Sequence, residues 1–135
     1  MKTKTKHILF ASVVLYIFTV ACGFSFSTAK INNAFMVRQT AEGLEQVSVF
    51  QPDEVFICFV ELANAPDDTL VNAAWYAEDI EGEQSNFLID EASITTGENE
   101  VFFDLSNNIL WPSGTYRVDI FLNEELSQSI AFQVQ

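Results

Sequence analysis

Beyond residue 30 the chain alternates between apolar and polar residues in short runs, which clusters of Gly, Pro, Asn and Asp separate. The clearest run covers 115–122, where four apolar residues occupy one face and Arg117 and Asp119 lie on the other. Successive side chains of a strand point to opposite faces of a sheet, so this period of two predicts strands with one buried face. Because no stretch of ten or more residues keeps a clean helical period of 3.6, we expect an all-β fold with Arg117 and Asp119 facing solvent.

Seven to eight runs of this kind follow one another, with turns at the spacing typical of a sandwich. The expected strands cover 31–38, 47–50, 54–62, 69–76, 86–94, 100–105, 115–122 and 126–134. Val71, Ala73 and Trp75 should then lie between two antiparallel sheets, and so should Leu126 at the start of the last strand. An antiparallel β-sandwich fits this spacing better than a closed barrel.

Three residues have a distinctive layout on the expected strands. Cys58 lies on one strand, Trp75 on the next, and Tyr116 two residues before the inward-facing Val118. This layout resembles the cysteine, tryptophan and tyrosine-corner pattern of immunoglobulin domains. Val118 stands where the second cysteine would be, so the resemblance implies an immunoglobulin-like sandwich whose sheets are held by packing, without a bridge between them.

Four short motifs lie along the expected domain: an F-x-P-D turn at 50–53, an N-A-P turn at 64–66, a V-x-A-x-W strand at 71–75 and a W-P-x-G-x-Y-x-V segment at 111–118. With these motifs the chain resembles a group of bacterial lipoproteins that carry one immunoglobulin-like domain. The resemblance implies the same fold and an extracytoplasmic location. It implies no activity.

The first residues have the form of a bacterial export signal. Three lysines precede a largely apolar run over 8–21, which is too short to span a bilayer. The run ends in Thr19, Val20, Ala21 and Cys22, which resembles a lipobox with Thr19 in place of the usual Leu. We therefore expect a lipoprotein signal peptide over 1–21, a lipidated Cys22 and short tether over 22–30, and the sandwich over 31–135. Lipid on Cys22 would hold the chain in the cell membrane or outer envelope, on the extracytoplasmic side; an ordinary signal peptide with a chance cysteine is the alternative.

Charge limits the partners that the domain can bind. The chain has 6 Lys and Arg against 19 Asp and Glu, and without the three leader lysines the balance is 3 − 19 = −16. Such a surface repels the phosphates of nucleic acids and anionic lipid headgroups. We expect no nucleic-acid partner, and contact with the membrane only through the lipid on Cys22.

The residues needed for catalysis are scarce. The only histidine, His7, lies in the leader, and Cys58 alternates with apolar residues as a small buried hydrophobe would. We therefore expect neither enzymatic activity nor a cofactor. Asp79, Glu81 and Glu83 form a weak calcium candidate in an acidic loop expected over 78–83, but they lack the spacing of an EF-hand, and a solvated loop is the stronger alternative.

Exposed aromatic residues point to recognition instead. Tyr76, Phe102 and Phe121 fall on strand faces that alternation assigns to solvent, Trp111 lies beside a proline, and the strand over 54–62 is apolar on both faces. These four side chains are possible contacts for a protein partner. The alternatives are that the N-terminal strand or a loop covers the apolar faces, and that Trp111 packs at the end of the sandwich.

The function expected from these features is that of a membrane-anchored, non-catalytic binding or assembly module. Two alternatives stay open: a structural envelope lipoprotein without a dedicated ligand, and an accessory domain of an extracellular enzyme system.

Overall fold

The structure is a computed structural model that describes residues 28–135, and this part of the chain is built from strands. Its nine strands are β1 (Lys30–Thr40), β2 (Gly43–Gln46), β3 (Val49–Phe50), β4 (Phe56–Ala63), β5 (Thr69–Ile80), β6 (Phe87–Thr96), β7 (Glu100–Leu105), β8 (Gly114–Leu122) and β9 (Glu125–Val134). The predicted all-β fold is confirmed. Within the described residues, no helix is long and apolar enough to cross a bilayer.

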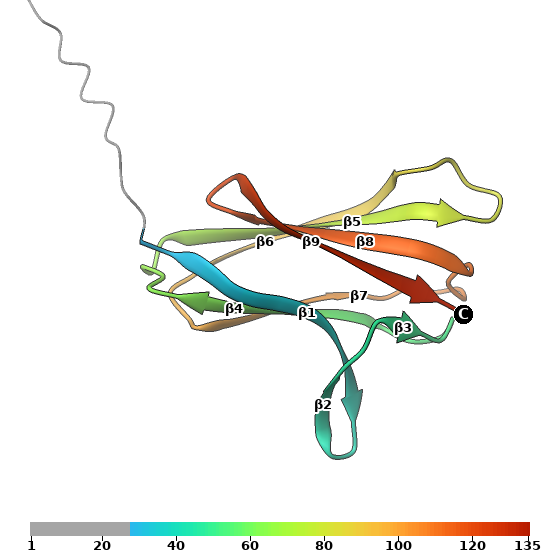
Figure 1. Ribbon diagram of the computed structural model, residues 1–135, viewed down its shortest axis with the longest axis horizontal. Coiled ribbons are helices and arrows are strands. Elements are labelled where there is room, and N and C mark those ends of the chain that lie inside the picture. The colour runs from blue at the N-terminus through green and yellow to red at the C-terminus, as the bar shows by residue number, and fades with distance from the viewer. Residues whose placement is uncertain (1–27) are drawn as a thin grey trace, which may run out of the picture.

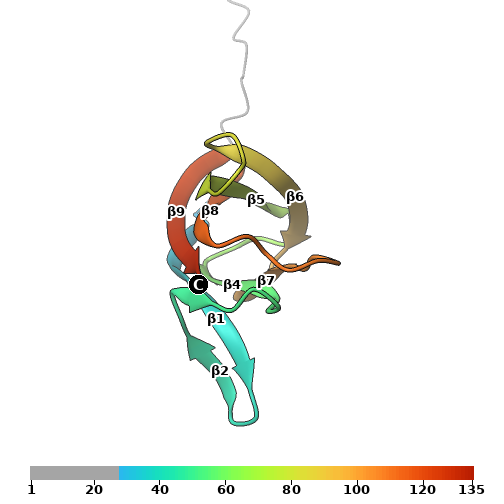
Figure 2. The same cartoon turned by 90° about the vertical axis from the view of Figure 1, so that its right-hand side faces the viewer.

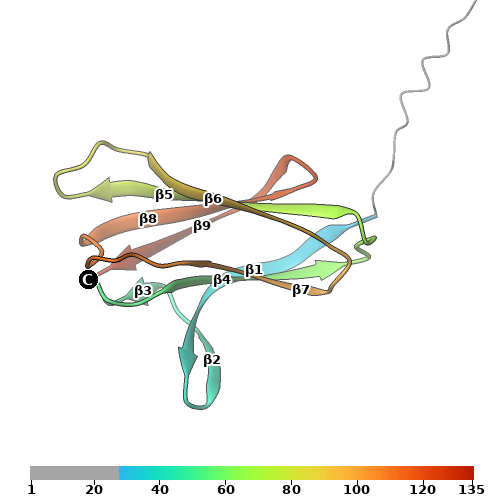
Figure 3. The same cartoon turned by 180° about the vertical axis from the view of Figure 1, so that it is seen from behind.

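The strands form two sheets that face each other across one core (Figure 1). One sheet has the order β2-β1-β4-β7, and the other has the order β3-β9-β8-β5-β6. The chain crosses between the sheets after β2, β3, β4, β6 and β7, and Figure 3 shows the two sheets from behind. All pairings are antiparallel except that of the two-residue β3 with β9. The predicted antiparallel sandwich is therefore confirmed.

Two strands run further than the alternation indicated. β1 continues to Thr40 and returns through β2 as a hairpin that projects from the sandwich (Figure 1), and Gly43 adopts the positive φ of 126° that the turn requires. β5 continues to Ile80 because its last residues still pair with β8, Asp79 opposite Thr115 and Ile80 opposite the start of that strand. Asp79 thus lies in a strand, and the acidic loop begins only at Glu81, which corrects the loop expected over 78–83.

The predicted inward faces are largely correct. Val71, Ala73 and Trp75 of β5 are buried, and the three predicted inward residues of β7 are buried with them. Leu126 is the exception, because it is 57% exposed. The β8–β9 pairing shifts register beside Phe121, and this irregularity breaks the alternation on which the prediction for Leu126 rested.

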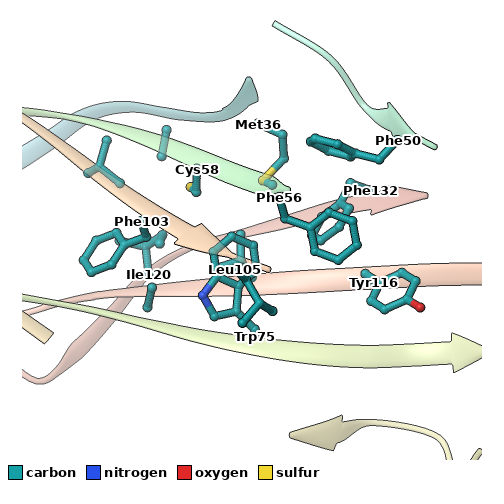
Figure 4. Packing of buried hydrophobic residues seen from close by; sticks show 14 of the residues in the cluster. Met36, Phe50, Phe56, Cys58, Trp75, Phe103, Leu105, Tyr116, Ile120 and Phe132 are labelled. Atoms are coloured by element: carbon teal, nitrogen blue, oxygen red, sulfur yellow. The ribbon is translucent and has the colours of Figure 1, made fainter. Parts of the chain in front are cut away.

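Aromatic rings fill one half of the core (Figure 4). This half lies at the start of β4 and of β8, at the end of the sandwich where the chain finishes. The ring of Phe56 lies 4.4 Å from that of Trp111, 4.8 Å from that of Phe132, 5.3 Å from that of Tyr116 and 5.2 Å from that of Phe50, measured between centroids. These separations fall in the favourable range for aromatic pairs. One ring from β4 therefore ties the two sheets and a connecting loop together.

Candidate recognition surfaces

Different segments of the chain lie at the two ends of the sandwich. At one end, called the near end, β1 begins: Lys30 pairs with Ala63, and the Thr28 hydroxyl donates to the Asn64 carbonyl at 3.2 Å. At the other, called the far end, lie the loops 51–55 and 106–113, the β5–β6 hairpin 81–86 and the C-terminus (Figure 1). The chain thus enters the domain at the end remote from these loops.

Two loops of the far end are joined by hydrogen bonds from Trp111. Its backbone N–H donates to the Pro52 carbonyl at 2.8 Å, and its indole N–H donates to the Glu54 carbonyl at 2.9 Å. The indole is stacked on Phe56 and is only 6% exposed. Trp111 therefore packs at the end of the sandwich, which is the alternative that the sequence left open, and it offers little surface to a partner.

The residues just before Trp111 are far more exposed. Ile109 is 72% exposed and Leu110 is 66% exposed, and Val55 on the neighbouring loop is exposed as well. The two loops line a hollow of about 480 Å³. Sequence alternation did not point to Ile109 and Leu110, because burial in an irregular loop follows no period.

An ion pair holds the 51–55 loop in place. The Arg38 guanidinium donates to both carboxylate oxygens of Glu54 and, at 2.9 Å, to the Val49 carbonyl. The same carboxylate accepts a bond from the Gln51 backbone N–H. The hydrogen bond from Arg38 lowers the pKa of Glu54 despite partial burial. Arg38 is therefore used to order the loop.

A row of phenylalanines crosses the outer face of the β1-β4-β7 layer. Phe35, Phe59 and Phe102 are direct neighbours in register, with ring centroids 5.1 Å and 5.2 Å apart. Phe102 is 42% exposed. The N-terminal strand β1 lies beside β4 in the same sheet and so does not cover this face, which rejects one of the two expected covers. The sequence did not identify Phe35, because only the β1–β4 pairing brings it to this row.

The outer face of the other sheet is occupied by a polar cluster around Arg117. Its guanidinium lies 4.5 Å from the centroid of the Tyr76 ring and donates to Asp119 at 2.9 Å and to Glu78 at 3.0 Å. Asp119 is nearly buried and also accepts a bond from the Ser129 hydroxyl at 2.7 Å. The expectation that Arg117 and Asp119 face open solvent is therefore wrong, since neighbouring strands supply partners that partly bury both. Tyr76 is half-buried beneath the guanidinium.

Phe121 lies on the same sheet, at a shallower place. It is half-buried and lines a small hollow of about 220 Å³ together with Asn72, Glu91 and Glu124. The Asn72 amide donates to the Ser93 hydroxyl. The hollow lies on an open sheet face.

The calcium candidates are not brought together. Asp79 lies in β5, and Glu81 and Glu83 follow in the hairpin. In the described residues 28–135, no three His, Cys, Asp or Glu side chains are grouped so that they could hold a metal ion. Cys58 is buried as predicted, and burial raises its pKa to about 12, so its thiol stays protonated at neutral pH. Cys22 and the predicted signal peptide and tether up to residue 27 lie outside the described residues.

One further bond identifies the class of fold. The Tyr116 hydroxyl donates to the Pro112 carbonyl, four residues upstream, at 2.6 Å. This is the bond of a tyrosine corner, and it confirms that element of the resemblance. With the two facing sheets and their strand order, it defines the described part of the chain as an immunoglobulin-like β-sandwich domain.

Solved structures agree with this class. The chain is similar to an immunoglobulin-like protein from Pseudomonas aeruginosa, with a TM-score of 0.54 and 14% identity over 79% of this chain and 96% of that one. It is also similar to part of the alkylpurine DNA glycosylase AlkC from Pseudomonas fluorescens (TM-score 0.50, 17% identity, 79% of this chain and 30% of that one). A β-glucosidase from Listeria innocua is similar to the same extent (TM-score 0.50, 14% identity, 81% and 16%). At such identities the similarity shows the fold alone. No protein-family model matches the sequence, and no curated protein matches it.

Proposed function

We propose that this chain is a lipid-anchored, extracytoplasmic binding module, cut before Cys22 and attached to the membrane through that cysteine. The observation that carries the proposal is the sequence of residues 19–22, with the first strand beginning at Lys30, eight positions after Cys22. Eight residues span at most about 29 Å when fully extended. The near end of the sandwich would then stay close to the bilayer.

The far end would be presented away from the membrane. β5 has 12 residues and runs from the near end to the far end, and at about 3.3 Å per residue it extends for roughly 40 Å. The exposed apolar side chains Val55, Ile109 and Leu110 lie at the far end. This arrangement suits a module that meets its partner beyond the membrane surface.

The side chains best suited to catalysis are already engaged in ion pairs or buried. This favours a binding function over an enzymatic one. Arg38 and Arg117 are both held in ion pairs, and the Cys58 thiol is buried with a raised pKa. A nucleophile needs an adjacent base, and the only histidine lies in the leader. These features support a non-catalytic role.

Lipid labelling of the full-length chain in bacterial cells tests the anchor. Cells are fed an alkyne analogue of palmitate, and the labelled chain is followed through membrane fractionation. We expect label and membrane association for the natural chain, and loss of both for Cys22→Ala. The matched control is Cys58→Ala, which removes the other cysteine and should keep the label. Label retained on Cys22→Ala, or a natural chain that fractionates as a soluble protein, would contradict the proposal.

A further inference from the structure

We propose that the Ile109-Leu110 tip of the 106–113 loop is the docking element of the domain, and that it inserts into an apolar pocket with a basic rim on another extracytoplasmic protein. The proposal deepens the proposed function and rests on it for the orientation of the far end. The connection between β7 and β8 extends beyond the side of the two sheets, as Figure 2 shows.

The exposed tip is attached to a well-ordered part of the loop, which begins at Trp111. Ile109 and Leu110 are the two most exposed large apolar side chains among the described residues. The next residue, Trp111, is buried and is joined by two hydrogen bonds to the 51–55 loop. A rigid base loses little conformational freedom when the tip binds, so the tip is preorganised for a partner.

The shape of the surface supports insertion. Ile109 and Leu110 line the hollow of about 480 Å³ between the two loops, and exposed Val55 of the 51–55 loop lines it as well. A partner that receives Ile109 and Leu110 can place an apolar side chain of its own into this hollow. Apolar anchors that fill pockets carry most of the binding energy in protein interfaces.

Charge identifies the chemistry of the partner. Residues 28–135 contain three basic side chains: Arg38 is paired with Glu54, Arg117 with Glu78 and Asp119, and Lys30 lies at the near end. The far end therefore presents exposed Asp53 and no free cation among the described residues. Opposite charges around an apolar centre speed association and select partners. A basic rim fits this end, whereas a second copy of this acidic chain or an anionic lipid surface would be repelled.

One edge strand of the sandwich disfavours self-association in the same way. β6 is an edge strand of its sheet, and Asp90 and Glu91 stand exposed in the middle of it; Glu91 faces Ala74 on the neighbouring strand. Two copies paired along this edge would bring these carboxylates together. The loop tip is therefore the better candidate for contact with another molecule.

Photo-crosslinking of the full-length chain in membranes of its host tests the proposal. Benzoylphenylalanine replaces Asn108, which leaves Ile109 and Leu110 intact. The matched control carries the same crosslinker at Ser127, beside the exposed Leu126 at the near end. We expect a discrete protein adduct from position 108 only. The crosslinked peptide of the partner, sequenced by mass spectrometry, should combine apolar residues with Lys or Arg.

Two further variants examine the chemistry of the contact. Ile109→Ser with Leu110→Ser should reduce the adduct at least tenfold, whereas Leu126→Ser should leave it unchanged; both should keep the thermal midpoint of the natural domain, because all three side chains are exposed. Added salt should lower the adduct yield, since it screens the attraction to a basic rim. An adduct of twice the mass of the chain, an adduct with lipid, equal adducts from both positions, a partner peptide without basic residues, or no adduct would each overturn the proposal.

Alkyne-palmitate labelling in the same cells separates this proposal from the one on which it rests. Loss of the adduct with the label retained overturns the docking element alone. Loss of the label with the adduct retained overturns the anchor and leaves the docking element standing.

Discussion

Replacement of Trp75 by alanine should remove a large part of the stability of the domain. The side chain is 1% exposed between the sheets, with the rings of Phe56 and Phe132 at 6.4 Å and 6.2 Å. Truncation of a buried tryptophan costs about 3–5 kcal/mol, because the transfer energy is lost and a cavity remains. The two aromatic contacts place the expected loss near about 4 kcal/mol. A domain of this size has about 5–15 kcal/mol in total.

Urea unfolding of the natural domain and of Trp75→Ala measures this loss. Trp111 remains in the variant and is buried against Phe56, so its fluorescence still reports unfolding. The midpoint should fall while the dependence on urea stays the same, because both chains expose nearly the same surface. Phe102→Ala is the matched control: this ring is 42% exposed on the outer face, and its loss should cost about 1 kcal/mol. If Phe102→Ala were as damaging as Trp75→Ala, the division into inner and outer faces would be wrong.

Three smaller changes test single features. Tyr116→Phe removes the hydrogen bond to Pro112 and should cost about 1 kcal/mol of stability. Because burial raises the Tyr116 pKa to about 12, the natural domain should lose stability as pH rises from 10 toward 12. The variant should lose less stability over this range in alkaline melts. Gly114→Ala should cost at least about 2 kcal/mol in thermal melts, since a Cβ would lie 2.3 Å from a backbone oxygen, against about 1 kcal/mol for Gly82→Ala, where space is open. Because the pKa of Glu54 is lowered, its contribution to stability is present above the ordinary glutamate pKa of about 4.3 and is lost as pH falls below it. Glu54→Gln should therefore make stability less dependent on pH on the acid side. An unchanged pH dependence there would contradict the role of the ion pair.

The fold could be predicted because alternation is a local signal. In β7 the residues at 101, 103 and 105 are buried and those between them are exposed, as a period of two requires. Val71, Ala73 and Trp75 are buried at the same spacing, although Ala74 between them is buried as well. The prediction for Leu126 is wrong because β9 itself carries one extra residue, Ser127, where its register with β8 shifts, and such a bulge leaves no mark in the hydrophobic period.

The surface was harder to predict because it depends on pairing between distant residues. Arg117 and Asp119 were expected in solvent, yet Glu78, which is 39 residues away from Arg117, and Ser129 from the next strand enclose them. Burial of a long polar side chain depends on such neighbours and not on its place in a strand. The exposed pair Ile109 and Leu110 was not identified from the sequence, because the loop before Trp111 has no alternation from which burial could be predicted, and only Trp111 turns into the core.

An aromatic cluster lies beside the place where many immunoglobulin domains hold a disulfide between their sheets, since Phe56 and Tyr116 stand two residues before Cys58 and Val118. Cys58 is buried without a disulfide, and Val118 is buried on the facing sheet. A disulfide acts largely on the unfolded chain, whereas packed rings stabilise the native state directly. Trp111 belongs to this cluster and also follows Ile109 and Leu110 directly in the 106–113 loop. The packing that joins the two sheets therefore also orders the exposed tip, so a change that loosens the cluster at Phe56 should weaken docking before it unfolds the domain.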